Sequence, residues 1–191
     1  MLKKLLILLS ITIITACGGG GDDAAAENVA TDGTSPVIPV EEEYTEQYII
    51  DKLGLPEEPD EEENNSTPTG VDKNENYIRD NVERQIAFDH YPDLQKIKLL
   101  NDYAAEYTKQ IIHFSDDDKD SYIESDKRES VVIGCMSYLY GEEGYFNILT
   151  LINLLDEGGN RREESLNRTG FIGSSTLMSY SDRKKICPNY K

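Results

Sequence analysis

Residues 92–114 read PDLQKIKLLNDYAAEYTKQIIHF. Apolar side chains recur along this stretch every three or four positions, at Ile97, Leu100, Ala104, Tyr107 and Ile111. This spacing puts them on one stripe of an α-helix, so the stretch predicts an amphipathic helix with one face in a core. Pro92 suits the first turn, where its missing N–H has no helical partner. The stretch therefore predicts a helical fold.

The segment before this stretch has the same period. Asp80 to His90 carries Val82 and Ile86 at i and i+4. The Tyr91–Pro92 step ends that helix, because the residue before a proline avoids helical backbone angles.

Three further helices are expected downstream. The first runs over about residues 119–140, and the second follows Gly141 and Gly144 and ends near residue 155. A third is expected over residues 161–171, and we expect the Ser-rich stretch from Gly173 onward to form an irregular loop. The prediction is an all-α fold, a small helical bundle of four to five helices after a disordered acidic tether, with the folded domain at residues 71–191.

Most of the negative charge precedes the predicted domain. The net charge is −18, and residues 22–63 hold 15 acidic residues against one basic residue, Lys52. Such a composition stays solvated, so residues 17–70 are predicted to be a mostly disordered tether in which residues 42–55 form a short helix. The tether is a spacer or, alternatively, an acidic ligand for a cationic partner or divalent ions. Nucleic acid is disfavoured as a partner because no basic patch is evident.

The first residues have the pattern of a secretion signal. Lys3 and Lys4 precede a short apolar run to Ala16, which predicts a signal peptide at residues 1–16 rather than a spanning helix. Residues 14–17, Ile-Thr-Ala-Cys, resemble the lipobox of bacterial lipoproteins. The resemblance implies lipidation of Cys17 and a membrane anchor, and Gly18 after the cysteine favours the outer membrane. An ordinary signal with a chance cysteine is the alternative.

The cysteine count then bears on the fold. With Cys17 lipidated, Cys135 and Cys187 are left in a compartment where disulfides persist, so they are predicted to pair. The alternative is one buried and one exposed thiol. The chain has no Cys-x-x-Cys motif or Cys/His cluster, which disfavours structural zinc and thioredoxin-like chemistry.

One loop has the spacing of a metal site. Residues 72–83 read DKNENYIRDNVE, a twelve-residue frame in which oxygen-bearing side chains stand at positions 1, 3, 5, 9 and 12 and position 7 offers a carbonyl. A hard cation such as calcium takes six to eight oxygen ligands, and this is the EF-hand arrangement. The predicted ligands are Asp72, Asn74, Asn76, Ile78, Asp80 and Glu83.

The loop also resembles calcium loops of extracytoplasmic bacterial proteins with the pattern Asp-x-Asn-x-Asn-Gly-Ile-Arg-Asp-Asp-Val-Glu, a family of unassigned function, and dockerin-like modules. The chain departs from the pattern at Tyr77, where the family has glycine, and at Asn81, where it has aspartate. Position 6 tends to need a positive φ, and three carboxylates predict weak calcium binding. The alternative is a degenerate loop that only caps the helix after it.

A second acidic group, Asp116, Asp118 and Asp120, mimics the start of such a loop, but Lys127 occupies position 12, so we interpret it as a helix cap. His90 and His113 are the only histidines, and we interpret both as cap or surface residues. The chain contains none of the common catalytic motifs.

These patterns together predict a lipid-anchored protein of the cell envelope, on the periplasmic or surface face of the outer membrane. The expected role is a binding or structural envelope module with calcium as a cofactor and an envelope protein or polysaccharide as a partner. The alternative is a hydrolase of cell-wall or surface polysaccharide using paired carboxylates between residues 116 and 129.

Overall fold

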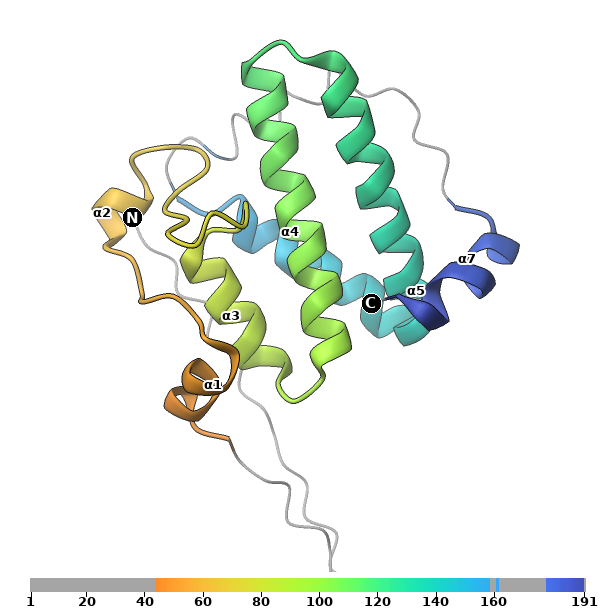
Figure 1. Ribbon diagram of the computed structural model, residues 1–191, viewed down its shortest axis with the longest axis horizontal. Helices are drawn as coiled ribbons and strands as arrows, with labels where there is room; N and C mark the ends of the chain where they lie inside the picture. Colours follow the sequence, from red (N-terminus) through yellow and green to blue (C-terminus); the bar gives the residue numbers. More distant parts are fainter. Residues whose placement is uncertain (1–43, 159–160, 162–177, 191) are drawn as a thin grey trace, which may run out of the picture. The chain divides into compact units, whose positions relative to one another are not determined.

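The computed structural model describes residues 44–158, 161 and 178–190. These residues form six α-helices and one short 3-10 helix, and no strand occurs among them (Figure 1). The all-α prediction is confirmed. The predicted signal peptide, Cys17, the tether up to residue 43 and most of the helix expected over residues 161–171 lie outside the described residues.

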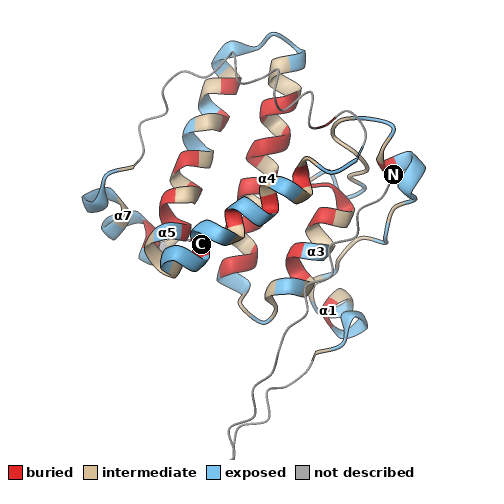
Figure 2. Cartoon of the chain, turned by 180° about the vertical axis from the view of Figure 1, so that it is seen from behind, coloured by how far each residue is buried: buried red, intermediate tan, exposed pale blue. Residues whose placement is uncertain are grey.

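Helix α4 (Leu94–Ser115) lies at the centre of the bundle. It begins where the Asp93 carboxylate accepts a hydrogen bond from the Lys96 backbone N–H at 2.9 Å. The predicted apolar stripe is buried along its full length, and Figure 2 shows buried stretches along α4, which lies between α3 and α5. Helices α3 (Asp80–His90) and α5 (Lys119–Leu155) pack against α4. The stripe therefore organises the core as the sequence predicts.

Helix α5 has two arms joined at Gly141. There φ is +60° and ψ is −134°, a conformation that only glycine adopts readily. The two helices predicted on either side of Gly141 are confirmed as the two arms of α5, which meet at this non-helical residue.

Polar contacts hold this bend against the start of α4. The Lys96 ammonium lies 2.6 Å from the Glu143 carboxylate and 4.6 Å from the centre of the Tyr140 ring. The Tyr140 hydroxyl donates to the Asp93 carboxylate at 3.0 Å. Burial and this carboxylate raise the pKa of Tyr140, so the phenol stays protonated. Both arms of α5 are therefore positioned by the first turn of α4.

The N-terminal end of the described chain is more ordered than the sequence predicts. Two helices precede Val71, near which the domain boundary is predicted. Helix α1 (Glu46–Leu53) confirms the short helix expected in the tether, and α2 (Glu61–Asn64) lies in a stretch predicted to be disordered. The physical reason includes a long-range contact: Asn64 is buried, and its backbone carbonyl accepts a hydrogen bond from the Arg161 guanidinium, while its side-chain oxygen accepts one from the Val71 N–H at 3.0 Å.

The C-terminal end also departs from the prediction of an irregular loop. Residues 180–186 form α7 (Tyr180–Ile186), followed by the 3-10 helix η2 (Cys187–Asn189). Ser179 caps α7 by accepting from the Asp182 N–H at 3.2 Å. A disulfide joins Cys187 to Cys135 on α5, as the cysteine count predicts, and both residues are fully buried.

Removal of this disulfide tests its contribution. The bond closes a loop across a sequence separation of 52 residues. On the chain-entropy model, the double variant Cys135→Ala/Cys187→Ala should lose about 4 kcal/mol of unfolding free energy, because the unfolded chain is no longer constrained. Urea unfolding of variant and oxidised parent measures this. A loss below about 1 kcal/mol would contradict the constraint.

Candidate functional site

The predicted calcium loop is a tight turn in which side-chain oxygens accept backbone hydrogen bonds. Asp72 accepts from the N–H groups of Asn76 and Tyr77 at 3.1 and 2.7 Å. Asn76 in turn accepts from the Ile78 N–H at 2.8 Å. Such turns are intrinsic to Asp and Asn, so the local sequence itself folds this loop.

The last residue of the frame folds back onto the loop. Each Glu83 carboxylate oxygen accepts a hydrogen bond of 3.0 Å, one from the Asn74 amide and one from the Asn76 amide. Four of the six predicted ligand residues, Asp72, Asn74, Asn76 and Glu83, therefore belong to one hydrogen-bonded group.

The fifth predicted ligand residue, Asp80, is the first residue of α3 and is 0% exposed. Its carboxylate accepts from the Lys73 N–H at 3.1 Å. Burial raises the pKa of Asp80, and the nearby Asp72 charge raises it further; burial also raises the pKa of Glu83. The remaining predicted ligand residue, Ile78 at position 7 of the frame, lies in the hydrophobic core. The loop thus holds two carboxyl groups whose charged forms are disfavoured by their surroundings.

Tyr77 has the positive φ that position 6 was expected to need. Its φ is +69°, and Glu75 is also left-handed at +58°. For a non-glycine residue this costs about 1–2 kcal/mol. The Lys109 ammonium lies 5.1 Å from the centre of the Tyr77 ring, a cation–π contact worth about 0.5–1 kcal/mol at an exposed site. Packing against α4 therefore offsets part of the strain.

The donor set suits a hard cation in chemistry, because it is made of carboxylate and amide groups. The two amides point their nitrogens at Glu83, so both would have to turn their oxygens inward to ligate an ion. Within the described ranges, no three His, Cys, Asp or Glu side chains are grouped as a metal site would require. Any cation here would depend on the amide oxygens.

Arg79 connects the loop to the end of α5. Its backbone carbonyl accepts the N–H groups of Val82 and Glu83, which starts α3. Its buried guanidinium donates to the carbonyls of Leu154 at 2.7 Å and Glu157 at 3.1 Å. Burial and the charge of Arg161 lower the pKa of Arg79 to about 10, so it is cationic at neutral pH, as the negative end of a helix favours.

Arg161 makes a second clamp at the same place. Its guanidinium donates to the Glu157 carbonyl at 2.8 Å, the Pro68 carbonyl at 3.0 Å and the Asn64 carbonyl. Gly70 makes room for the first clamp, since a Cβ there would lie 2.4 Å from Cδ of Arg79. The sequence signals neither clamp, because the carbonyls that these arginines contact are distant along the chain. All of them lie at least 70 residues from the arginine, apart from the Glu157 carbonyl that Arg161 contacts.

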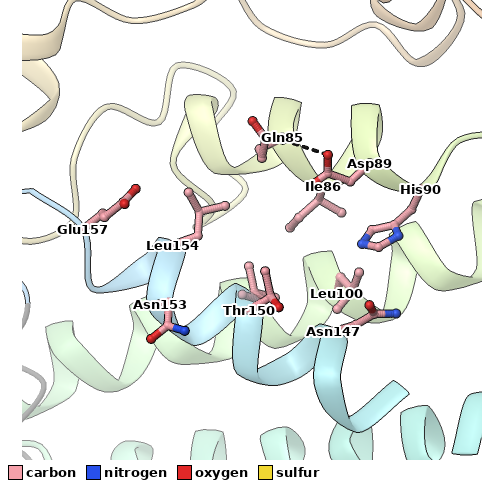
Figure 3. Close-up of a pocket in the computed structure, with 11 residues that line it drawn as sticks. Gln85, Ile86, Asp89, His90, Leu100, Asn147, Thr150, Asn153, Leu154 and Glu157 are labelled. Atoms are coloured by element: carbon pink, nitrogen blue, oxygen red, sulfur yellow. Dashed lines mark hydrogen bonds between the residues drawn. The ribbon is translucent and has the colours of Figure 1, made fainter. Parts of the chain in front are cut away.

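A cleft of about 430 Å³ lies beside these clamps, between α3 and the second arm of α5 (Figure 3). Figure 3 shows Glu157 and His90 at opposite ends, with Ile86 and Leu154 between them. Burial and the charge of Lys96 lower the pKa of His90, so its imidazole is neutral at pH 7. The lining residues have carboxylates and amides but no Lys or Arg, so the cleft suits a small neutral or cationic molecule. Its residues are Gln85, Ile86, Asp89, His90, Leu100, Asn147, Thr150, Leu151, Asn153, Leu154 and Glu157.

The second acidic group forms a helix cap, as predicted. Asp118 accepts from the Ser121 N–H at 3.1 Å at the start of α5, and hydrogen bonds from the Ser121 side chain and from this N–H lower the pKa of Asp118. Asp116 and Asp120 are exposed beside it. His113 lies near the end of α4 and is partly exposed, as expected for a surface residue.

The fold and loop define a disulfide-closed helical bundle to which the tight loop at residues 72–83 is fastened by arginine. No family model, curated protein or solved structure matches the chain. Within the described residues, no helix combines the length and apolar character needed to cross a membrane.

Replacement of Arg79 tests the clamp. Arg79→Met keeps the aliphatic bulk but leaves buried carbonyls at the end of α5 without donors, so the unfolding free energy should fall by about 3 kcal/mol. Arg128→Met is the control: Arg128 is exposed and pairs with Glu124 at 3.0 Å, and its loss should cost at most about 1 kcal/mol. If the two variants lost the same unfolding free energy in urea, the clamp would be contradicted.

Proposed function

We propose that this protein is a lipid-anchored module of the cell envelope that binds a partner and is stabilised by calcium at residues 72–83. The anchor is Cys17, at the end of a lipobox-like signal, and the outer membrane is the proposed address. The binding role falls to the folded domain, for which an envelope protein or polysaccharide is the proposed partner.

The observation that carries the calcium proposal is the convergence of the loop side chains. Asp72, Asn74 and Asn76 are gathered by their own backbone hydrogen bonds, and Glu83 returns from the first turn of α3 to meet the two amides. This is the order of contacts that an EF-hand-like loop needs before the amides turn toward an ion. With three carboxylates in the frame, binding belongs in the weak extracellular range, with Kd of about 10⁻⁴–10⁻³ M.

The cleft between α3 and α5 supports a binding role. It is large enough for a small polar molecule, and its carboxylates and amides can bind hydroxyl or amine groups. Two of its lining residues, Leu154 and Glu157, also supply the backbone carbonyls that accept hydrogen bonds from Arg79. Arg79 belongs to residues 72–83, so these bonds connect the cleft to the proposed calcium loop.

Hydrolysis of a polysaccharide has less support. Asp116, Asp120 and Glu124 are exposed, and Asp118 caps a helix with a lowered pKa. A general acid needs a raised pKa, whereas the pKa of Asp118 is lowered. We therefore keep binding as the proposed function.

Calcium binding is tested by thermal unfolding. At a calcium concentration ten times Kd, binding to the folded chain adds about 1.4 kcal/mol, which raises the unfolding midpoint by about 3–6 °C. Glu83→Gln should abolish this shift, because the carboxylate that meets both amides is lost. Glu75→Gln, the same change at an exposed position of the loop, should keep it. A parent midpoint that calcium leaves unchanged, with no heat of binding, would refute the site.

The pH dependence follows from the raised pKa of Asp80. A carboxyl with a raised pKa in the folded state binds its proton more tightly there, so its contribution to stability is lost as pH rises through that pKa. Without calcium, Asp80→Asn should therefore be at least as stable as the parent at pH 7 and should lose this advantage in acid. Calcium should reverse the order at pH 7, because the ion favours the carboxylate.

Urea unfolding at pH 5 and 7, with and without calcium, makes this comparison. Asp120→Asn, the same change at an exposed position, is the control and should follow the parent throughout. If Asp80→Asn is less stable than the parent at pH 7 without calcium, the charged Asp80 carboxylate does not destabilise the folded state. That result would contradict the predicted pH dependence.

A further inference from the structure

A face rich in exposed aromatic residues lies where α5 bends. Tyr145 is 54% exposed and Phe146 is 61% exposed, both in the first turns of the second arm, and Tyr180 of α7 is 71% exposed. Exposed large apolar side chains of this kind, when they occur together, mark a surface that contacts something else. We call residues 137–146 of α5 together with α7 the aromatic-basic face.

Its two parts adjoin. The Tyr138 ring of α5 lies 6.1 Å from the Tyr180 ring of α7. Ser137, the neighbour of Tyr138, begins a shallow groove of about 410 Å³ that reaches Tyr145 and Phe146. The disulfide between Cys135 and Cys187 fastens α7 beside this part of α5. The two groups of aromatic side chains are therefore carried by adjoining turns of α5.

The same face carries unpaired positive charge. Helix α7 contains Asp182 and three cations, Arg183, Lys184 and Lys185, in a chain whose net charge is −18. The Asp182 carboxylate accepts a hydrogen bond from the Ser179 hydroxyl at 2.6 Å. Lys184 and Lys185 are exposed, and in the described part of the chain neither has a carboxylate within salt-bridge distance. Among the described residues, these two ammonium groups have no ion-pair partner, and they lie on the helix that carries Tyr180.

We propose that the aromatic-basic face docks on a membrane surface of anionic phospholipid. Tyr and Phe rings are suited to the headgroup region, where the ring meets apolar chains and a polar edge meets water. Lysine ammonium groups near the surface are attracted to the anionic phosphates of the lipid. Ile186, half exposed at the end of α7, adds apolar area. Glu142, at the rim of the groove, repels the same surface, so binding is weak and sensitive to salt.

The proposed lipid anchor would turn this weak docking into a stable orientation. If Cys17 carries the lipid, 26 residues separate it from the first described residue, Tyr44, and such a segment extends at most about 90 Å. The bundle can therefore reach the bilayer that holds its anchor. The stable orientation therefore rests on the proposed function, which includes the lipid on Cys17. The affinity of the face for lipid does not depend on that anchor.

Tryptophan fluorescence tests the proposal, because the chain contains no tryptophan. The mature chain with Cys17→Ser is used, so that acylation plays no part. Phe146→Trp places a reporter on the face, and Tyr48→Trp places one on α1, where Tyr48 is comparably exposed. With vesicles of phosphatidylglycerol and brominated phosphatidylcholine in equal parts, emission from the Phe146→Trp protein should shift to the blue and be quenched. Emission from the Tyr48→Trp protein should not change.

Charge reversal supplies the second arm. Lys184→Glu/Lys185→Glu should weaken vesicle binding by at least about tenfold. Lys119→Glu/Lys127→Glu makes the same charge change at exposed positions of α5 and should have a much smaller effect. Circular dichroism confirms that each variant is folded.

Several results would overturn the proposal. They are no quenching of the Phe146→Trp protein, equal quenching of both reporters, equal loss in both charge variants, or equal binding to vesicles of phosphatidylcholine alone. Concentration-dependent self-association in sedimentation without vesicle binding would assign the face to a second copy and also overturn it. Failure of lipidation at Cys17 or of calcium binding would leave these vesicle results standing, so the two proposals fail separately.

Discussion

The buried guanidinium of Arg79 is the interaction on which the arrangement of the loop and the bundle depends. With its backbone carbonyl Arg79 begins α3, and with its side chain it completes the hydrogen bonding at the end of α5. A helix end buried without donors is costly, and a guanidinium buried without acceptors is costlier still, so each requires the other. The clamp thereby fixes where α3 leaves the loop and where the second arm of α5 stops.

The same region joins three features of the molecule that lie far apart in the sequence. Arg161 fastens residues 64–68 to the Glu157 carbonyl, the cleft ends at Glu157, and the proposed calcium loop leads directly into Arg79. Calcium at the loop would tighten the start of α3, which forms one wall of the cleft. In the middle of α5, the bend at Gly141 and the disulfide at Cys135 gather α7 and the aromatic residues. The second arm of α5 thus runs from the aromatic-basic face to the polar region around Arg79.

The loop shows how much of the candidate site could be predicted from the sequence. The positions of Asp72, Asn74 and Asn76 were recognisable because their side chains bond to backbone N–H groups two to five residues away. The positive φ at Tyr77 followed from the frame in the same way. The complete burial of Asp80 was not predictable, because it depends on helices packed over the loop. The cleft was equally invisible, since its lining comes from three helices.

The sequence by itself determined the helices and the inner shape of the loop. Periodicity, caps and breaks act within a few residues, so the stripe on α4, the end of α3 before Pro92 and the bend at Gly141 are local properties of the chain. Only the tertiary structure decided that residues 61–64 form an ordered turn of helix, that Tyr180–Ile186 is helical, and that Arg79 and Arg161 are buried at the end of α5. Those outcomes depend on contacts across 70 or more residues for the arginines and on a disulfide across 52 for the C-terminal helix. Such contacts form only when the bundle closes, because the free energy that holds them comes from burial shared by all the helices.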